Sequence, residues 1–277
     1  MSTIPVGKEN STSIDLHYED HGTGQPVVLI HGWPLSGAAW EKQVPALLAA
    51  GHRVITYDRR GFGRSSQPAS GYDYDTFAAD LDALLTRLDL ENVVLVGFSM
   101  GGGEVARYLG KHGAKRVSKA AFLGAITPYL KKAADNAGGV DGTVFDGIQK
   151  GLRADRPAFL TGFFRDFYNV DQLGGKAISD EALRLSWNIA MAASPIGTIE
   201  CVTAWGTDFR ADLRKIDVPT LIMHGDDDQI VPIDASARLS ATLVKGSVLK
   251  VYPGFSHGMC SVNKDQINAD LLAFIAG

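Results

Sequence analysis

The sequence has little cysteine and almost no charge imbalance. Its 277 residues include only Cys201 and Cys260, which lie far apart and form no CxxC-like pattern, so two buried thiols in a cytosolic protein are the simplest expectation. The formal net charge is −4. The chain therefore lacks the basic excess that binding to phosphates or anionic lipids requires, and we expect no nucleic-acid or membrane partner.

Long apolar runs are also missing. No stretch approaches the roughly 20 apolar residues that span a bilayer. Residues 1–13 lack the cationic start and the apolar run of a secretory signal, so we expect a cytoplasmic protein. With 277 residues, of which 45% are hydrophobic, the chain is long enough for one large domain with a sizeable core.

Short apolar runs alternate with helical patterns along most of the chain. Most of these runs are apolar at consecutive positions, as in strands that helices cover on both faces, and Ser13–Glu19 alternates like an antiparallel edge strand. This order predicts an α/β fold with a mostly parallel, doubly wound sheet. The other predicted strands are Val27–Ile30, Arg53–Tyr57, Asn92–Val96, Ala120–Leu123, Pro219–Met223 and Val248–Tyr252, and the predicted helices lie near 37–50, 75–88, 101–112, 233–243 and 263–275.

The alternation of short apolar runs with helical patterns stops between Thr127 and Ile216. This segment contains helical patterns and many aromatic and glycine residues but no convincing buried strand. A structureless stretch of about 90 residues is not expected in a compact protein. We predict a helical cap over residues 127–215, inserted into a core formed by residues 1–126 and 216–277.

The segment from Val93 to Gly102 reads VVLVGFSMGG, a buried strand followed by the pattern GxSxG and a helix. In this arrangement a sharp turn lifts the hydroxyl group of Ser99 above the end of the strand. Gly97 and Gly101 supply room for the turn, and the start of the helix directs free N–H groups toward developing negative charge. A bare GxSxG is common by chance, but its place between a strand and a helix predicts a nucleophile.

A serine nucleophile needs a neighbouring base, and seven histidines compete for this role. His257 lies between the last predicted strand and the last predicted helix. Loops at the carboxyl ends of strands line the binding crevice of a doubly wound sheet, so we predict His257 as the base. The remaining histidines are interpreted as exposed surface residues (His17, His21, His52 and His112) or as structural residues at strand ends (His31 and His224).

An acid that orients the imidazole should lie between Ser99 and His257 in the chain. The run Asp226-Asp227-Asp228 follows a strong strand in this interval, and the chemistry of the residues alone does not choose among the three. A calcium loop would need a spacing of the type DxDxDG. The run lacks this spacing, so we predict no metal.

Acyl transfer also needs two N–H donors for the tetrahedral oxyanion. One is expected from the backbone of Met100, directly after the nucleophile. The second is expected from the loop after the strand Val27–Ile30, where Trp33 is the candidate because Pro34 has no N–H to give.

Several longer motifs make the sequence similar to a known family. They are VVLIHGWPLSGAAW, RVITYDRRGFGRSS, GYDYDTFAADL, VVLVGFSMGGGEVARY, DFYN, TDFRAD and HGDDDQIVPI, and together they extend over nearly the whole chain. The chain resembles the cofactor-free haloperoxidases, also called non-haem chloroperoxidases or perhydrolases, with their aryl-esterase relatives. The resemblance implies the α/β-hydrolase fold, with a sheet of about eight strands and an inserted helical cap, and no cofactor.

The resemblance also implies roles for individual residues. Pro34 matches a family feature that accompanies the use of hydrogen peroxide as acyl acceptor. The final loop reads GFSHGM where many relatives have an A-P-H-G form, which puts the shape of the acyl pocket in doubt. The implied nucleophile is Ser99, the base His257, the acid Asp228 (four residues before the proline of its loop), and the oxyanion donors the backbone N–H groups of Trp33 and Met100.

We predict a serine hydrolase of small carboxylic or aryl esters that transfers the acyl group to water or, in perhydrolysis, to hydrogen peroxide. A peroxyacid formed in this way could oxidise halide without haem or metal. A lactonase, a lactamase or a carbon–carbon bond hydrolase would keep the same triad, and a noncatalytic small-ligand receptor could retain it. The oligomeric state is left open, a homo-oligomer included. The substrate pocket is expected around Pro34, Ile126, Phe145, Phe159, Trp187 and Ile230.

Overall fold

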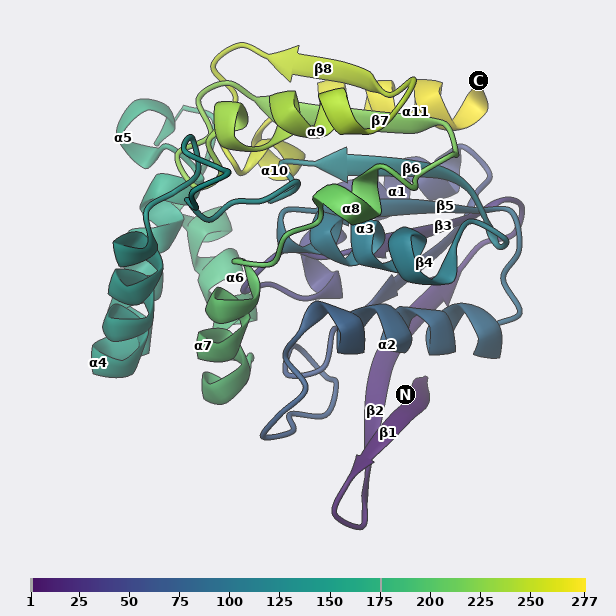
Figure 1. The fold of residues 1–277 in the computed structure, drawn as a ribbon, viewed down its shortest axis with the longest axis horizontal. Coiled ribbons are helices and arrows are strands. Elements are labelled where there is room, and N and C mark those ends of the chain that lie inside the picture. The colour runs from purple at the N-terminus through teal and green to yellow at the C-terminus, as the bar shows by residue number, and fades with distance from the viewer. Residues whose placement is uncertain (1, 175) are drawn as a thin grey trace.

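The computed structural model describes residues 2–174 and 176–277, which contain one eight-stranded sheet ordered β1-β2-β4-β3-β5-β6-β7-β8 (Figure 1). The strands from β4 to β8 in this order run parallel, whereas β1 pairs antiparallel with β2 and β2 with β4. This confirms the predicted mostly parallel sheet. The strands are β1 (Thr3–Glu9), β2 (Thr12–His21), β3 (Pro26–Ile30), β4 (Arg53–Tyr57), β5 (Val93–Phe98), β6 (Val117–Leu123), β7 (Thr220–Gly225) and β8 (Val248–Tyr252).

The burial of a strand determines whether its hydrophobic pattern can be recognised in the sequence. Strands β5 and β7 are buried at every position, as central strands covered on both faces must be. Strand β1 was not predicted, because Ile4 is its one buried residue and a mostly exposed edge strand carries little hydrophobic pattern.

Helices cover both faces of the sheet (Figure 1). Helices α2, α3 and α9 lie on one face and α1 and α11 on the other. Among the described residues, no helix combines the length and the apolar character needed to cross a membrane. The helices outside the β6–β7 segment are η1 (Gly37–Trp40), α1 (Gln43–Ala49), α2 (Tyr74–Arg87), α3 (Met100–His112), η2 (Ile233–Ala235), α9 (Ala237–Leu243), α10 (Met259–Val262) and α11 (Lys264–Ala276).

Between β6 and β7 the chain forms further helices, of which α4 to α7 lie beyond the carboxyl ends of the parallel strands, whereas α8 packs beside α3 and α9 on one face of the sheet (Figure 1). The longest of them, α4, is broken at Asp155, whose φ of −158° and ψ of 88° are not helical. Pro157 follows and cannot continue the helical hydrogen bonds, while the Asp155 carboxylate accepts the Ala158 N–H at 3.0 Å as a new cap. These helices are α4 (Gly142–Phe167), α5 (Val170–Leu173), α6 (Asp180–Met191), α7 (Pro195–Ala204) and α8 (Arg210–Leu213).

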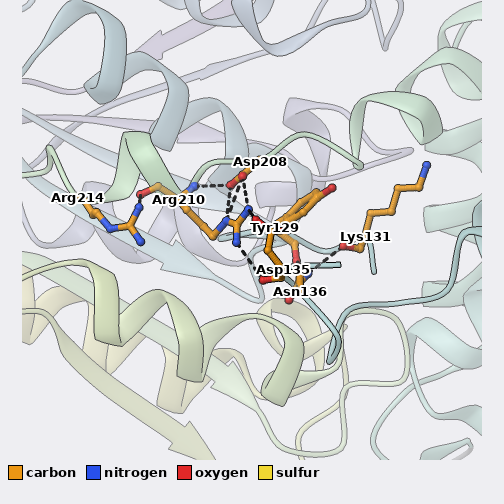
Figure 2. A network of polar contacts seen from close by, with 7 residues as sticks. All are labelled: Tyr129, Lys131, Asp135, Asn136, Asp208, Arg210 and Arg214. Carbon is orange, nitrogen blue, oxygen red and sulfur yellow. Dashed lines mark hydrogen bonds and ion pairs between the residues drawn. The ribbon is translucent and has the colours of Figure 1, made fainter. Parts of the chain in front are cut away.

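A polar network joins the two ends of this segment (Figure 2). The guanidinium of Arg210, before β7, donates to Asp135 Oδ2 at 2.7 Å and to Asp208 Oδ2 at 2.6 Å. Its Cζ lies 5.0 Å from the centre of the Tyr129 ring, and Asn136 Nδ2 donates to the Tyr129 carbonyl oxygen at 2.7 Å. The network therefore ties the beginning of the segment to its end, with the helices between them as an insertion. Its treatment as a separate cap domain stays a prediction.

Candidate active site

The turn at Ser99 joins β5 directly to α3. Its φ of 54° and ψ of −119° place a non-glycine residue in a strained backbone conformation, which persists only when the surroundings hold it. A Cβ at Gly97 would lie 2.5 Å from the Gly101 carbonyl oxygen, and one at Gly101 would lie 2.3 Å from the Ile30 carbonyl oxygen. The two glycines thus allow the helix to approach the sheet closely behind the turn.

His257 lies in the loop between β8 and α10 and connects Ser99 to Asp228. Its Nε2 is 3.0 Å from Ser99 Oγ, and its Nδ1 is 2.6 Å from Asp228 Oδ2. The exposed fractions are 5% for Ser99, 1% for His257 and 7% for Asp228. The ring is flanked by Phe98 and Phe167, with centroid separations of 4.9 and 4.8 Å. A neutral imidazole with Nδ1–H toward the carboxylate presents the lone pair of Nε2 to the hydroxyl, as a general base requires.

Asp228 is surrounded by hydrogen-bond donors. Its Oδ1 accepts the backbone N–H groups of Ile230 at 2.9 Å and Val231 at 2.8 Å. Burial by itself raises the pKa of Asp228, but the facing His257 and the hydrogen bonds from His224 and His257 outweigh it. The pKa of this carboxyl group therefore lies below its ordinary value, and the group stays ionised.

The other two aspartates of the run point elsewhere. Asp226 accepts the Gly254 N–H at 2.6 Å, and Asp227 accepts a hydrogen bond from Asn169 Nδ2 at 2.8 Å. Asn169 also donates to the carbonyl oxygen of Asp227 at 2.8 Å, which ties the end of the DFYN motif to the loop after β7. Residue chemistry alone did not distinguish the three aspartates. In the folded loop, Asp228 is the one of the three that hydrogen-bonds His257.

The loop after β3 runs beside Ser99. A Cβ at Gly32 would lie 2.9 Å from the Cβ of Ser99. The next residue, Trp33, is buried, and its indole Nε1 donates to the Thr198 carbonyl oxygen at 3.0 Å. Met100 is the first residue of α3, where the backbone N–H has no carbonyl acceptor one turn earlier. The roles of Trp33 and Met100 as oxyanion donors stay predictions.

A buried polar network supports this loop. His31 Nδ1 lies 2.8 Å from the Gly32 carbonyl oxygen, and its Nε2 accepts the Arg59 N–H at 2.9 Å. Burial first and the nearby Arg59 charge second lower the pKa of His31, which keeps the ring neutral. The Arg59 guanidinium pairs with Glu104 of α3 at 2.7 Å. Arg59 and Glu104 were not predicted as site residues, although the motifs RVITYDRRGFGRSS and VVLVGFSMGGGEVARY contain them.

A cavity of about 470 Å³ lies between the inserted helices and the loop after β7. Phe163 and Trp205 line it, and their rings pack edge-on against Trp33 with centroid separations of 5.0 and 4.9 Å. Trp187 does not line it, because its ring turns toward α4 and donates from Nε1 to the Pro157 carbonyl oxygen at 3.1 Å. Of the other predicted pocket residues, Phe145, Phe159 and Ile230 line this cavity, whereas Pro34 and Ile126 are buried outside its described lining.

Comparison with known proteins agrees with this architecture. One family model, described as the alpha/beta hydrolase fold, matches residues 25–263. The chain belongs to the α/β-hydrolase family. This hydrolase is 58% identical to a Synechocystis protein named putative non-heme chloroperoxidase, over 99% of its own length and 100% of the relative.

A second relative and a solved structure show to which members of the family the chain is similar. The hydrolase is 40% identical to the bifunctional esterase/perhydrolase of Acinetobacter calcoaceticus, over 95% of its own length and 96% of the relative. The crystal structure of a bromoperoxidase from Bacillus anthracis superposes with a TM-score of 0.96 at 48% identity, covering 100% of this chain and 99% of that one. Within the family, the hydrolase belongs with the non-haem chloroperoxidases and their esterase and perhydrolase relatives.

One histidine of the hydrolase lies in an unexpected place. His17, interpreted from the sequence as exposed, is 6% exposed, and its backbone N–H donates to Ser65 Oγ at 2.8 Å. The expectation was wrong because the loop after β4 packs against β2 here, and the Asp58 N–H donates to the His17 carbonyl oxygen at 2.9 Å. Strand β2, with β1 and β4 on either side, is also not the expected edge strand. His31 and His224 are buried at or next to the ends of β3 and β7, as expected of structural residues.

Proposed function

We propose that this hydrolase cleaves small carboxylic or aryl esters through an acyl-enzyme on Ser99, with His257 as the base and Asp228 as the acid that orients it. The observation that carries the proposal is the continuous chain of hydrogen bonds from Ser99 Oγ to the Asp228 carboxylate, with separations of 3.0 and 2.6 Å. The names of the relatives support the same chemistry. They do not favour a lactonase, a lactamase, a carbon–carbon bond hydrolase or a noncatalytic receptor.

The first half of the reaction forms the acyl-enzyme. Ser99 Oγ attacks the ester carbonyl carbon while His257 Nε2 takes the hydroxyl proton, and the Asp228 carboxylate stabilises the imidazolium. The carbonyl oxygen becomes an oxyanion, which the backbone N–H groups of Trp33 and Met100 would receive. The imidazolium then protonates the leaving alcohol, and the carbon–oxygen bond to the alcohol breaks.

The second half transfers the acyl group from Ser99 to an acceptor. His257 takes a proton from water while the water oxygen attacks the acyl carbon; the carbon–oxygen bond to Ser99 then breaks, the imidazolium returns the proton to Ser99 Oγ, and the acid RCOOH leaves. When hydrogen peroxide takes the place of water, the same steps release the peroxyacid RCOOOH. A peroxyacid carries an oxygen–oxygen bond that can oxidise bromide or chloride in solution, giving RCOOH and hypohalous acid when one proton is taken up. Esterase and haloperoxidase activity would then share one nucleophile.

The aromatic cavity is the proposed site for the organic part of the ester. It adjoins both Trp33, through Phe163 and Trp205, and the acid loop, through Ile230. Its size of about 470 Å³ suits a small acyl or aryl group, since ligand pockets commonly enclose several hundred cubic ångströms. A mostly apolar wall that includes four aromatic rings favours burial of an aryl ester over a charged substrate.

Replacement of Ser99 tests the shared nucleophile. Hydrolysis of p-nitrophenyl acetate and peroxide-dependent bromination in acetate buffer are measured in parallel for wild type and Ser99→Ala. Both rates are expected to fall together by about 10⁴-fold or more, because the alanine cannot form the acyl-enzyme. A matched control is Ser118→Ala on β6, which removes a hydroxyl that donates to the Asn92 carbonyl oxygen at 3.1 Å and should leave both rates near wild type.

Each other outcome contradicts a definite part of the proposal. Bromination that survives Ser99→Ala while ester hydrolysis is lost rejects the peroxyacid route. Survival of both rates rejects Ser99 as the nucleophile. A wild-type protein that binds aryl esters without turning them over favours a receptor.

A further inference from the structure

A second histidine lies behind the triad carboxylate. His224, near the end of β7, is buried with an exposed fraction of 0%. Its Nε2 is 3.2 Å from Asp228 Oδ2, the oxygen that also faces His257, and 2.9 Å from the Val231 carbonyl oxygen. The two imidazoles therefore approach one carboxylate oxygen, one from β7 and the other from the loop after β8.

The partners of His224 fix its protonation state. Both groups facing Nε2 are acceptors, so this nitrogen carries a hydrogen; it donates to the Val231 carbonyl oxygen, while Asp228 Oδ2 lies 3.2 Å from the same nitrogen. The Nδ1 atom is buried and has no hydrogen-bond partner among the described residues. A buried N–H without an acceptor is costly, which favours the tautomer that carries its hydrogen on Nε2.

We propose that His224 is a positioning residue for the reaction, acting on His257 through Asp228. This inference rests on the proposed function, since it assigns His224 a role only if the Ser99, His257 and Asp228 triad operates. The Nε2–H of His224 holds Oδ2 in line with His257 Nδ1, while the backbone N–H groups of Ile230 and Val231 hold Oδ1. The carboxylate is then held at both oxygens and cannot rotate away from the base.

The same contact tunes the basicity of His257. A carboxylate that shares its charge among several donors has less left to stabilise the facing imidazolium. Removing the His224 donor leaves more of the negative charge of Asp228 to stabilise the His257 imidazolium. The charged and titratable groups close to the pair are few: His257 faces Asp228 from the loop after β8, whereas Asp226 and Asp227 in the same loop as Asp228 are bonded to Gly254 and to Asn169.

Two amide substitutions at His224 distinguish the effect of losing its hydrogen-bond donor from the effect of losing its ring. In His224→Gln the side-chain amide nitrogen can occupy the place of Nε2 and keep the donor. In His224→Asn the shorter side chain ends near the place of Nδ1 and cannot reach Asp228. The control for simple loss of packing is Ile222→Ala, which lies two residues earlier on the same face of β7, is 2% exposed and makes no contact with the carboxylate through a polar atom.

The readout is the pH profile of kcat/KM for p-nitrophenyl acetate, whose acid limb reports protonation of the free base. We expect His224→Asn to lower kcat about three- to tenfold and to move the acid limb to higher pH by about 0.5 unit. We expect His224→Gln to restore the acid limb of wild type. Ile222→Ala should lower the melting temperature without moving the limb.

The alternatives are separable. If His224→Asn folds and keeps the wild-type acid limb while Ser99→Ala is inactive, the triad operates and the role of His224 is rejected. If Ile222→Ala moves the limb as far as His224→Asn, the effect is one of packing and the inference is also rejected. If Ser99→Ala retains ester hydrolysis, the proposed function itself fails. If His224→Asn does not fold, a limb in His224→Gln that differs from wild type rejects the donor assignment, and a limb that matches supports it.

Discussion

Gly101→Ala tests how strongly the nucleophile turn depends on the close approach of α3 to the sheet. A methyl group at this position would lie 2.3 Å from the Ile30 carbonyl oxygen and 3.0 Å from that of His31. Both contacts are with backbone atoms, which cannot rotate away as a flexible side chain can. The helix or the end of β3 must therefore move by roughly 1 Å to restore an ordinary van der Waals separation.

The expected cost follows from this displacement. Forcing an extra methyl group into a filled site typically costs about 1–3 kcal/mol, and the better helix propensity of alanine returns up to about 1 kcal/mol. We expect Gly101→Ala to lower the free energy of unfolding by about 2 kcal/mol. Because a shift of about 1 Å in a reacting group can cost about 100-fold, kcat for p-nitrophenyl acetate should fall by a similar factor.

Denaturant unfolding followed by circular dichroism, together with steady-state kinetics, measures both effects. The matched control is Gly147→Ala in α4, an exposed helical position where an added Cβ meets nothing within 4 Å. This variant should be more stable than wild type by up to about 1 kcal/mol and equally active. A Gly101→Ala protein with the stability and the kcat of wild type would refute the reasoning.

Two further predictions concern the acid. Asp228→Asn should fold but lose about 10⁴-fold in kcat, because the amide cannot hold the proton of His257 on Nδ1 and so leaves no free lone pair on Nε2; a loss below tenfold would contradict this. The pKa of Asp228 is lower in the folded state, so its stabilising contribution is present above the unfolded pKa, near about 4, and is lost as the pH falls through the folded value. The difference in unfolding free energy between wild type and Asp228→Asn, measured by urea unfolding, should shrink below about pH 4; a difference that stays constant to pH 2 would count against it.

Features set by local sequence could be predicted. The buried strands β5 and β7 appear as consecutive apolar residues because both of their faces are covered. The turn at Ser99 appears as GxSxG because its strained backbone and close contacts exclude larger residues at the flanking positions. In each case the physical constraint acts within a few residues, so the pattern can be recognised in one short segment of the sequence.

Features set by contacts between distant segments could not be predicted. The pairing of Arg59 with Glu104 and the burial of His17 depend on which strands become neighbours. The orientation of the Asp226–Asp228 run depends on Asn169, which reaches it from the inserted helices. Asp228 was predicted as the acid only from the resemblance to a family, because the three residues of the run are all aspartates.

The division between chemistry and substrate choice follows from the topology. The candidate nucleophile, acid, base and oxyanion loop come from the carboxyl ends of β5, β7, β8 and β3, which parallel pairing places along one edge of the sheet. The cavity is walled largely by the insertion, which contacts the oxyanion loop through the rings of Phe163 and Trp205 against Trp33. Substitutions at α4 residues that line the cavity, such as Phe145 and Phe159, should therefore reshape the proposed acyl pocket while the distances among Ser99, His257 and Asp228 stay fixed. Substitutions at Phe163 or Trp205 should affect both the pocket and the oxyanion loop, because each of these rings lines the cavity and packs against Trp33.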